Sequence, residues 1–489
     1  MKVMICYPPL LKTKGIPQWG QNRQFQYFSH PTYIYPMIPA SAATLLKNDD
    51  FDVYWADGVA QKWSYDFFLH YFDSIDPDLV VMEAKTPIIK QIWDIIDQLK
   101  DNAPDTSFAL VGDHVTALPK ESLERSKVDY VVTGGDFDVS LLKLAQHLRN
   151  GFPLPKGVWY RGSEGVKSTG PFELMENLDE LPFIDRDLTK WWLYYENWYK
   201  RKPFTYMMAG RDCWWRKNGG CTFCAWTVIF PKFRVRSPER HLDEVGELID
   251  RYNVREIFDD TGTFPSSKWL EKFCKGMIER GHNDEVLFSC NFRYDQINRD
   301  TCKLMKKAGF RLLKVGLESA SQETLDRINK GIRIQQIIDG CRIAKEAGLE
   351  IHLTIMVGFP WETREDALKT LALAKMLMEE GLADVLQSTI VVPYPGTRLY
   401  QQALEFDWFR IDPGDYERYD MTEPVLKARD MTPEDVVKIC DDIYKVYFSP
   451  KYILHRFIKS LMSKDDLMLN IRGIKAVMGH IKDFAIVRI

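Results

Sequence analysis

The chain has 489 residues, a formal net charge of −4 at pH 7 and 45% hydrophobic residues, which suits two or three globular domains. A nucleic-acid-binding protein would usually show a strong basic excess, and a transmembrane helix would need a run of about eighteen apolar residues; the sequence has neither. The nine cysteines stand mostly alone, which argues against a disulfide framework and favours a reducing cytoplasm. The apolar start of the chain, Val3–Tyr7, is too short for a signal peptide and is typical of a buried strand.

Residues 1–150 alternate short apolar runs with helical patterns. This alternation predicts an α/β domain with a doubly wound, Rossmann-like parallel sheet. Ligands of such sheets bind beyond the carboxyl ends of the strands, and those ends are rich in Gly, Asp and His here. The expected strands are Val3–Tyr7, Val53–Ala56, Leu79–Met82, Phe108–Gly112 and Tyr130–Thr133, and the expected helices are Ile38–Lys47, Ile88–Lys100 and Val139–Arg149.

Residues 151–202 have a different character. A strand at Gly157–Arg161 is expected to belong to a short hairpin that closes near Ser163–Gly165. A Pro- and acid-rich stretch follows, and then an aromatic run from Trp191 to Tyr199. We interpret this segment as a linker that packs on both of its neighbours.

The alternation restarts in residues 203–396, where six β/α units follow one another in under 200 residues. Six parallel strands fit a partial (β/α)6 barrel, because a full eight-unit barrel needs about 250 residues, and the chemistry of such folds lies at the carboxyl ends of the strands. The expected strands are Thr205–Ala209, Glu256–Asp259, Val286–Asn291, Leu312–Leu317, Ile351–Val357 and Val385–Val392, separated by helices such as His241–Arg251, Ser266–Arg280, Arg299–Ala308, Ile334–Ala347 and Arg364–Glu380.

The last region, residues 397–489, is expected to be mainly helical, and basic residues interleave with apolar ones toward its end. Two interpretations stay open. The pattern favours an ordinary amphipathic helical cap with a solvated basic face. The alternative is a surface that touches anionic lipid or an anionic substrate, which would allow peripheral contact with a membrane.

Three cysteines cluster directly after the first barrel strand, at Cys213, Cys221 and Cys224. Three thiolates in one loop can hold three irons of a [4Fe–4S] cluster and leave the fourth iron open to an amine and a carboxylate, such as those of S-adenosylmethionine (SAM). A structural zinc site is the alternative, but zinc usually takes four ligands, often as two separated pairs, and no second pair exists here. The other six cysteines are interpreted as small core residues.

At these motifs the sequence, over about residues 1–400, resembles the cobalamin-binding radical SAM family. The family loop reads CxxxCxxC, whereas this chain has four extra residues before Cys221 and keeps the CxxC end. The resemblance implies that Phe223 packs on the SAM adenine, and that the ends of the second and fourth barrel strands hold the methionyl amine and the ribose. The residues implied to bind SAM are Phe223, Asp259, Asp260, Thr261, Glu318, Ser319, Gly358, Val392 and Pro393.

The resemblance also implies that residues 1–150 bind cobalamin. The stretch from Gly112 to Pro119 is similar to a family segment that lines the cobalamin cleft, and His114 is a candidate contact. The Asp-x-His-x-x-Gly motif of many cobalamin proteins is replaced by Asp57-Gly58-Val59, so ligation of cobalt by a histidine from that loop is not expected. The implied cobalamin residues are Pro8, Asp57, Gly58, Val59, Gly112, His114, Val115, Thr116, Gly134 and Gly135. A Rossmann-like domain that binds nothing is the alternative.

The activity that the resemblance implies is methyl transfer to an unactivated carbon or phosphorus centre. One SAM would methylate cobalamin, and a second would give a 5′-deoxyadenosyl radical that activates the substrate to take the methyl group from methylcobalamin. The same cofactors also serve cyclisation, rearrangement or oxidation, and a non-catalytic iron–sulfur or zinc scaffold is a third hypothesis. The expected partners are a small-molecule or lipid substrate and a low-potential electron donor such as ferredoxin or flavodoxin.

Overall fold

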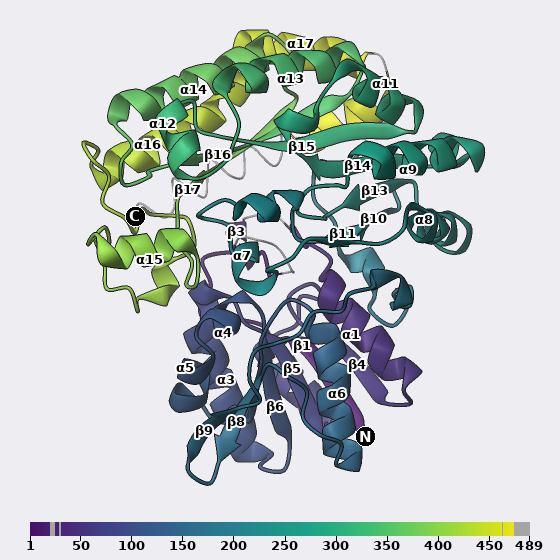
Figure 1. The fold of residues 1–489 in the computed structure, drawn as a ribbon, viewed down its shortest axis with the longest axis vertical. Coiled ribbons are helices and arrows are strands. Elements are labelled where there is room, and N and C mark those ends of the chain that lie inside the picture. The colour runs from purple at the N-terminus through teal and green to yellow at the C-terminus, as the bar shows by residue number, and fades with distance from the viewer. Residues whose placement is uncertain (20–24, 29–30, 462, 474–489) are drawn as a thin grey trace.

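The computed structural model describes residues 1–19, 25–28, 31–461 and 463–473. Two α/β units lie one above the other (Figure 1), with the N-terminal sheet at one end and the second sheet with its helices at the other. Within the described residues no helix is both long and apolar enough to cross a membrane.

The N-terminal unit is built on a seven-stranded sheet of order β4-β1-β5-β6-β7-β8-β9. Its parallel strands confirm the five predicted ones: β1 Lys2–Tyr7, β4 Asp52–Asp57, β5 Leu79–Glu83, β6 Ser107–Val111 and β7 Tyr130–Val132. The chain runs outward from β1 to β4 and then crosses to β5 on the other side. The carboxyl ends of β1 and β5 therefore form the switch point at which doubly wound sheets bind ligands.

Helices cover both faces of this sheet. Helices α3 (Ile89–Asn102) and α5 (Pro119–Arg125) lie on one side, and α1 (Met37–Asn48) and α6 (Phe137–Asn150) on the other (Figure 1). Helix α2 (Tyr65–Ile75) was not expected from the sequence. The predicted hairpin is present as β8 (Val158–Gly162) and β9 (Gly165–Ser168), and it extends the first sheet antiparallel to β7. The boundaries at 150, 202 and 396 remain predictions.

The second unit is the predicted partial barrel. Its six strands are all parallel and follow chain order: β10 Phe204–Met207, β13 Glu256–Asp259, β14 Leu287–Phe292, β15 Phe310–Glu318, β16 Glu350–Val357 and β17 Val385–Ile390. The connecting helices are α8 Pro238–Tyr252, α9 Ser267–Glu279, α11 Arg299–Lys307, α13 Ile334–Glu346 and α14 Arg364–Glu379. The strands are buried on both faces, as the continuous apolar runs in the sequence indicate.

In its described residues the C-terminal region contains the helices α15 Arg398–Glu405, α16 Pro433–Tyr444 and α17 Pro450–Ser460, followed by a helical stretch at 464–473. The segment between α15 and α16 is mostly irregular, apart from a short 3-10 turn at Tyr416–Arg418, and it contains the helix breakers Pro413, Gly414 and Pro424. This segment reaches the N-terminal unit, where the Tyr416 hydroxyl donates to Glu121 at 3.0 Å.

Candidate active site

The cysteine loop leaves the barrel through backbone contacts at the ends of two neighbouring strands. Asp259, the last residue of β13, accepts hydrogen bonds from the Ala209 amide at 2.8 Å and the Thr261 amide at 3.0 Å. The Thr261 hydroxyl accepts from the Gly210 amide at 2.9 Å. These contacts fix the start of the loop at the carboxyl end of the barrel, which is the end that carries chemistry in such folds.

The four extra residues of the loop belong to an ordered turn. The segment Trp214–Asn218 is a 3-10 turn, and Gly219 and Gly220 follow with φ of 88° and 70°, which returns the chain to Cys221. The Trp215 indole donates to the Asn329 carbonyl at 2.7 Å, and the Asn329 amide donates to the carbonyls of Asn218 and Gly220, each at 2.8 Å. The insertion therefore packs on the segment after β15, and the residues of the CxxC end take no part in these contacts.

Cationic side chains surround the three half-buried thiols. Burial raises the pKa of Cys221, and the charges of Lys330 and Arg293 oppose that rise. Burial lowers the pKa of Arg216, but Asp212 and then the thiols of Cys224 and Cys213 raise it above its ordinary value. Positive charge next to thiolates favours metal ligation by sulfur.

All nine cysteines, each of which lies in a described segment, are free thiols. No group of three His, Cys, Asp or Glu side chains that could hold one metal ion occurs among the described residues. The donor set at the loop, three thiols beside three cations, fits the negative charge of an iron–sulfur cluster. Ligation by Cys213, Cys221 and Cys224 remains a prediction.

Two of the predicted SAM segments meet at the ends of β15 and β16. Glu318 has a left-handed φ of 57°, and its carboxylate pairs with Lys330 at 2.6 Å. Ser319 next to it donates to Glu362 at 3.3 Å, and Glu362 also accepts from the Gly358 amide at 2.9 Å. The structure therefore places Glu318, Ser319 and Gly358 together.

Glu362 was not singled out in the sequence. Its carboxyl group is fully buried, and burial raises its pKa to about 7 although the Gly358 and Phe359 amides oppose the rise. A buried carboxylate without a cationic partner beside the predicted SAM segments can hold a proton near neutral pH.

The other predicted SAM residues lie at the same end of the barrel. Asp260 accepts from the Asn291 amide at 3.1 Å, while Asp259 is fully buried and lies 3.1 Å from His241 Nε2. Val392 and Pro393 are buried beyond β17, and Phe223 is half-buried in the loop. With three partners already, Asp259 holds the ends of β10 and β13 together; its contact with SAM stays a prediction.

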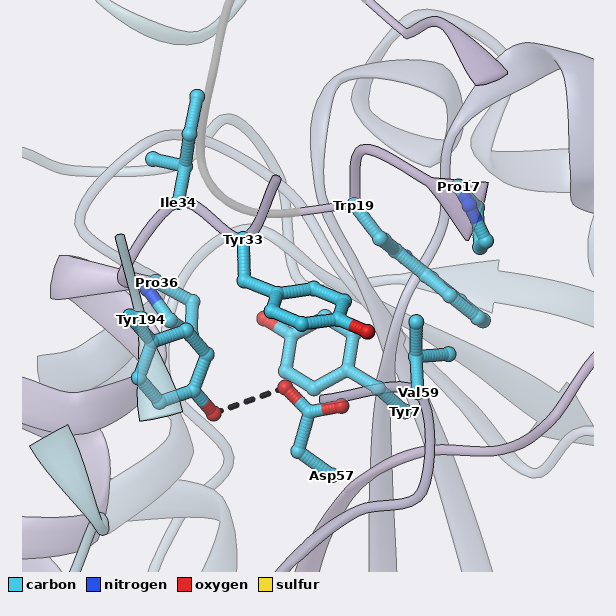
Figure 2. Close-up of a pocket in the computed structure, with 9 residues that line it drawn as sticks. All are labelled: Tyr7, Pro17, Trp19, Tyr33, Ile34, Pro36, Asp57, Val59 and Tyr194. Atoms are coloured by element: carbon cyan, nitrogen blue, oxygen red, sulfur yellow. Dashed lines mark hydrogen bonds between the residues drawn. The ribbon is translucent and has the colours of Figure 1, made fainter. Parts of the chain in front are cut away.

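A small pocket, with a cavity volume of about 10 Å³, lies at the carboxyl ends of β1 and β4 (Figure 2). Its wall combines strand ends with three segments that carry no family motif. The lining residues are Tyr7, Pro17, Trp19, Tyr33, Ile34, Pro36, Asp57, Val59 and Tyr194. Asp57 and Val59 belong to the predicted cobalamin set, whereas sequence reasoning missed the aromatic rings.

Asp57 is the polar group of this pocket. Its carboxylate accepts from the Ala60 amide and the Tyr194 hydroxyl, each at 2.8 Å (Figure 2). Burial raises its pKa to about 6 against the effect of these hydrogen bonds. The aromatic rings close around this acid, and the space left between them admits about one water molecule.

The remaining predicted cobalamin residues hold neighbouring loops together. Gly112 has a φ of 115°, and a side chain there would meet the Ala84 carbonyl at 2.8 Å. The Thr116 hydroxyl donates to the Gly112 carbonyl at 2.7 Å and accepts from the Gly134 amide at 3.0 Å. Gly135 donates to the Ile229 carbonyl at 2.9 Å, which joins this edge to the barrel. Pro8 follows β1 directly and borders Tyr7, while Val115 is fully buried.

His114 is also buried. Its Nδ1 lies 3.1 Å from the Thr86 hydroxyl and its Nε2 lies 3.7 Å from Glu121, and its ring packs edge-on to Tyr416. The contact of His114 with a corrin stays a prediction.

A buried ionic cluster joins the two units beside the cysteine loop. Arg211 pairs with Asp136 at 2.7 Å and with Asp138 at 2.6 Å, and Arg234 pairs with Asp136 as well. All four side chains are almost inaccessible to solvent. The start of the cysteine loop and the start of α6 in the N-terminal unit are thereby held at a fixed separation.

Comparison with known proteins supports this assignment of the barrel. Residues 210–374 match the family model described as the radical SAM superfamily, so this part of the chain is a radical SAM domain, which indicates an enzyme. An uncharacterized methyltransferase of Pyrococcus horikoshii is 28% identical over 425 residues, which cover 86% of this chain and 89% of the relative. The anaerobic magnesium-protoporphyrin IX monomethyl ester cyclase of Cereibacter sphaeroides is 24% identical over 83% of this chain and 65% of its own length.

The complete two-unit fold also occurs in a solved structure. The radical SAM methyltransferase TsrM of Kitasatospora setae, whose structure has cobalamin and a [4Fe–4S] cluster bound, superposes with a TM-score of 0.66 at 16% identity, over 91% of this chain and 88% of that one. This likeness confirms the predicted fold class. The radical SAM part of the resemblance drawn from the sequence motifs is confirmed by the family match, and cobalamin binding stays a prediction.

Proposed function

We propose that the protein is a cobalamin-dependent radical SAM methyltransferase that acts on an unactivated carbon or phosphorus centre. The observation that carries the proposal is the position of the cysteine loop, which lies at the carboxyl end of the barrel and is tied by Arg211 to the ligand-binding edge of the N-terminal sheet. Two cofactor sites that must act on one substrate would face each other across this junction.

Three cysteines, Cys213, Cys221 and Cys224, would hold the cluster, and the strand ends beside Asp57 would contact the cobalamin. When bound, these groups supply reductive cleavage of SAM to a 5′-deoxyadenosyl radical and a carrier for the methyl group.

The side chains of the protein would bind the cofactors, orient them and shield them from water. Arg293 and Lys330 would stabilise negative charge at Cys221, and Glu318, held by Lys330, presents a carboxylate oxygen that a ribose hydroxyl can donate to. The Arg211 cluster keeps the two sites at one separation, which favours reaction between groups bound at each and limits entry of water.

Cyclisation remains the second candidate, because one of the relatives is named as a cyclase. Methyl transfer is favoured because the Pyrococcus horikoshii relative and the superposed TsrM structure are both described as methyltransferases. The third hypothesis, a non-catalytic scaffold, predicts no turnover of SAM. A small-molecule or lipid substrate, a low-potential donor such as ferredoxin or flavodoxin, and a reducing cytoplasmic setting complete the proposal. The nine free thiols fit that setting.

The test is SAM turnover under strictly anaerobic conditions, with reconstituted cluster, added cobalamin and a low-potential reductant. Methyl transfer predicts cobalamin-dependent release of S-adenosylhomocysteine, whereas a cyclase would give 5′-deoxyadenosine without it.

Asp57→Ala, at the carboxyl end of β4, is expected to weaken cobalamin binding by about tenfold or more through loss of a buried charged hydrogen-bond acceptor. Asp52→Ala, at the exposed start of the same strand, is the matched control and should bind normally. S-adenosylhomocysteine formation that does not depend on cobalamin would contradict the proposal.

A further inference from the structure

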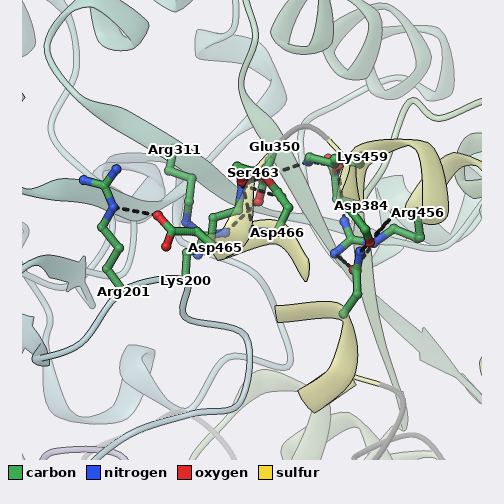
Figure 3. Close-up of polar contacts among 12 residues, drawn as sticks. Lys200, Arg201, Arg311, Glu350, Asp384, Arg456, Lys459, Ser463, Asp465 and Asp466 are labelled. Carbon is green, nitrogen blue, oxygen red and sulfur yellow. Dashed lines mark hydrogen bonds and ion pairs between the residues drawn. The ribbon is translucent and has the colours of Figure 1, made fainter. Parts of the chain in front are cut away.

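Helix α17 is amphipathic, but its polar face lies against the barrel and its apolar face is exposed to solvent, which is the reverse of an ordinary surface helix. Three of its polar side chains, Tyr452, Arg456 and Lys459, point inward. The Tyr452 hydroxyl donates to the Asp384 carbonyl at 3.0 Å, and Lys459 contacts Glu350 at 2.7 Å and Asp384 at 2.8 Å (Figure 3). Residues 452, 456 and 459 lie on one helical face, and Arg456 follows the same pattern, with Nη1 at 3.8 Å from Asp384. The helix is therefore seated on the barrel by charge and hydrogen bonds.

The opposite face of α17 is apolar and open to solvent. The spacing of its members places them on one side of the helix, and each is between 51% and 73% exposed. They are Ile453, Leu454, Phe457, Ile458 and Leu461. We call these five residues the outer face. An exposed apolar area of this kind marks an interaction site rather than a solvated cap.

The helical stretch that follows, residues 464–473, continues the same arrangement. Asn470 fixes it to α17 by accepting from Arg456 Nε at 2.7 Å and donating to the Arg456 carbonyl at 3.0 Å. Leu467, Met468 and Ile471 of this stretch are each more than 40% exposed. The apolar surface is thus larger than one helix.

The charge of this region indicates what covers the outer face. Among the described residues of this region, Lys459 and Arg456 contact Glu350 and Asp384 on the barrel side, and Asp465 and Asp466 pair with Arg201 and Lys200, so these charges do not face the apolar side chains. Lys451 and Lys464 are exposed beside the apolar side chains. A second copy of the chain would bring an equally positive face to this one, whereas an anionic lipid surface offers both an apolar interior and compensating charge.

We propose that α17 and residues 464–473 dock the enzyme on an anionic lipid bilayer, with the outer face inserted at the headgroup–acyl boundary. Glu350 begins β16 and Arg311 lies at the start of β15, so this surface is at the amino ends of the barrel strands. The cysteine loop lies at their carboxyl ends. Docking therefore leaves the cofactor edge and the N-terminal unit away from the bilayer (Figure 1). This inference is independent of the reaction that the site performs.

The experiment is flotation of the full chain with vesicles of phosphatidylcholine, alone or mixed with phosphatidylglycerol. We expect binding to the mixed vesicles, weaker binding at high salt, and little binding to phosphatidylcholine alone. The variant Leu454→Glu/Phe457→Glu/Leu461→Glu should lower the partition constant more than about a hundredfold, because three inserted side chains become charged. Leu404→Glu, at a comparably exposed apolar residue on α15, is the control and should bind as the unchanged protein does.

Lys451→Glu/Lys464→Glu gives a second, milder test, because it alters only exposed charge and should reduce the preference for anionic vesicles. Absence of binding by the full chain, or equal binding by the triple variant, would overturn the proposal. A concentration-dependent dimer in light scattering that the triple variant abolishes, without vesicle binding, would instead assign the outer face to self-association.

Discussion

Two buried glutamates at opposite ends of strand β16 experience opposite electrostatic environments. Glu350, the first residue of the strand, lies among Arg311, Lys459 and Lys200, which hold its pKa well below the usual range although burial alone would raise it. Glu362, just past the carboxyl end, accepts only neutral donors, and burial raises its pKa to about 7. The pKa of a buried carboxyl group is thus lowered at the amino end of the barrel and raised at the carboxyl end.

The difference indicates that the two ends of the barrel have different roles. At the amino end, cations and carboxylates are paired, and the pairs seat α17. At the carboxyl end, cations such as Arg293 and Lys330 lie beside thiols, and a carboxyl group keeps its proton near neutral pH. Lys330 and Arg293 are themselves paired, with Glu318 and Asp295, so what distinguishes the carboxyl end is the thiols and the buried Glu362, which has neutral hydrogen-bond donors.

The largest expected effect on stability comes from a substitution in the ion-pair network at the amino end of the barrel. Glu350→Gln should destabilise the protein by about 3–5 kcal/mol, because it removes one partner of a buried network and leaves Arg311, Lys200 and Lys459 undercompensated. Urea unfolding at neutral pH measures this. Glu365→Gln, at an exposed residue paired with Lys369, is the control and should unfold as the parent does. Equal unfolding of the two variants would contradict the paired-network description.

A smaller effect, which depends on pH, is expected at the carboxyl end. The folded pKa of Glu362, about 7, lies above the unfolded value near 4.3, so the folded state retains a proton that the unfolded chain loses, and stability falls as pH rises between these values. Glu362→Gln should remove about 2–3 kcal/mol of the stability difference between pH 5 and pH 8. Urea unfolding at both values tests this, again with Glu365→Gln as the control. A variant with the parent's pH dependence would refute the assignment.

The fold could be predicted from the sequence because apolar periodicity directly reflects burial in parallel strands. All eleven predicted parallel strands are present, from β1 to β17, since each is an apolar run flanked by loop residues. Helix α2 was missed because its sequence is rich in aromatic residues, which are weak helix formers, and its cap is a single serine that accepts from Phe67. The stretch between α15 and α16 is irregular because prolines interrupt the helical pattern there, within a region that the sequence predicts to be mainly helical.

The site could be predicted only in part. The cysteine loop and the strand-end motifs are continuous in sequence, so the cysteine spacing predicts the first and the family resemblance implies the second. The aromatic wall of the N-terminal pocket comes from Trp19, Tyr33 and Tyr194, which belong to separate loops without periodicity. The pairs that Arg211 makes with Asp136 and Asp138 join residues more than 70 positions apart, and no local pattern encodes such a pairing.

The central claim, that the cysteine loop performs radical SAM chemistry, is tested most directly by SAM cleavage under anaerobic conditions with reconstituted cluster and a low-potential reductant. Mass spectrometry of 5′-deoxyadenosine compares the intact protein with Cys224→Ala and with Cys302→Ala, whose cysteine is buried in α11 away from the loop. The account predicts product from the intact protein and from Cys302→Ala, and none from Cys224→Ala. Product from Cys224→Ala at the level of the intact protein, or zinc in place of iron with no product at all, would contradict it.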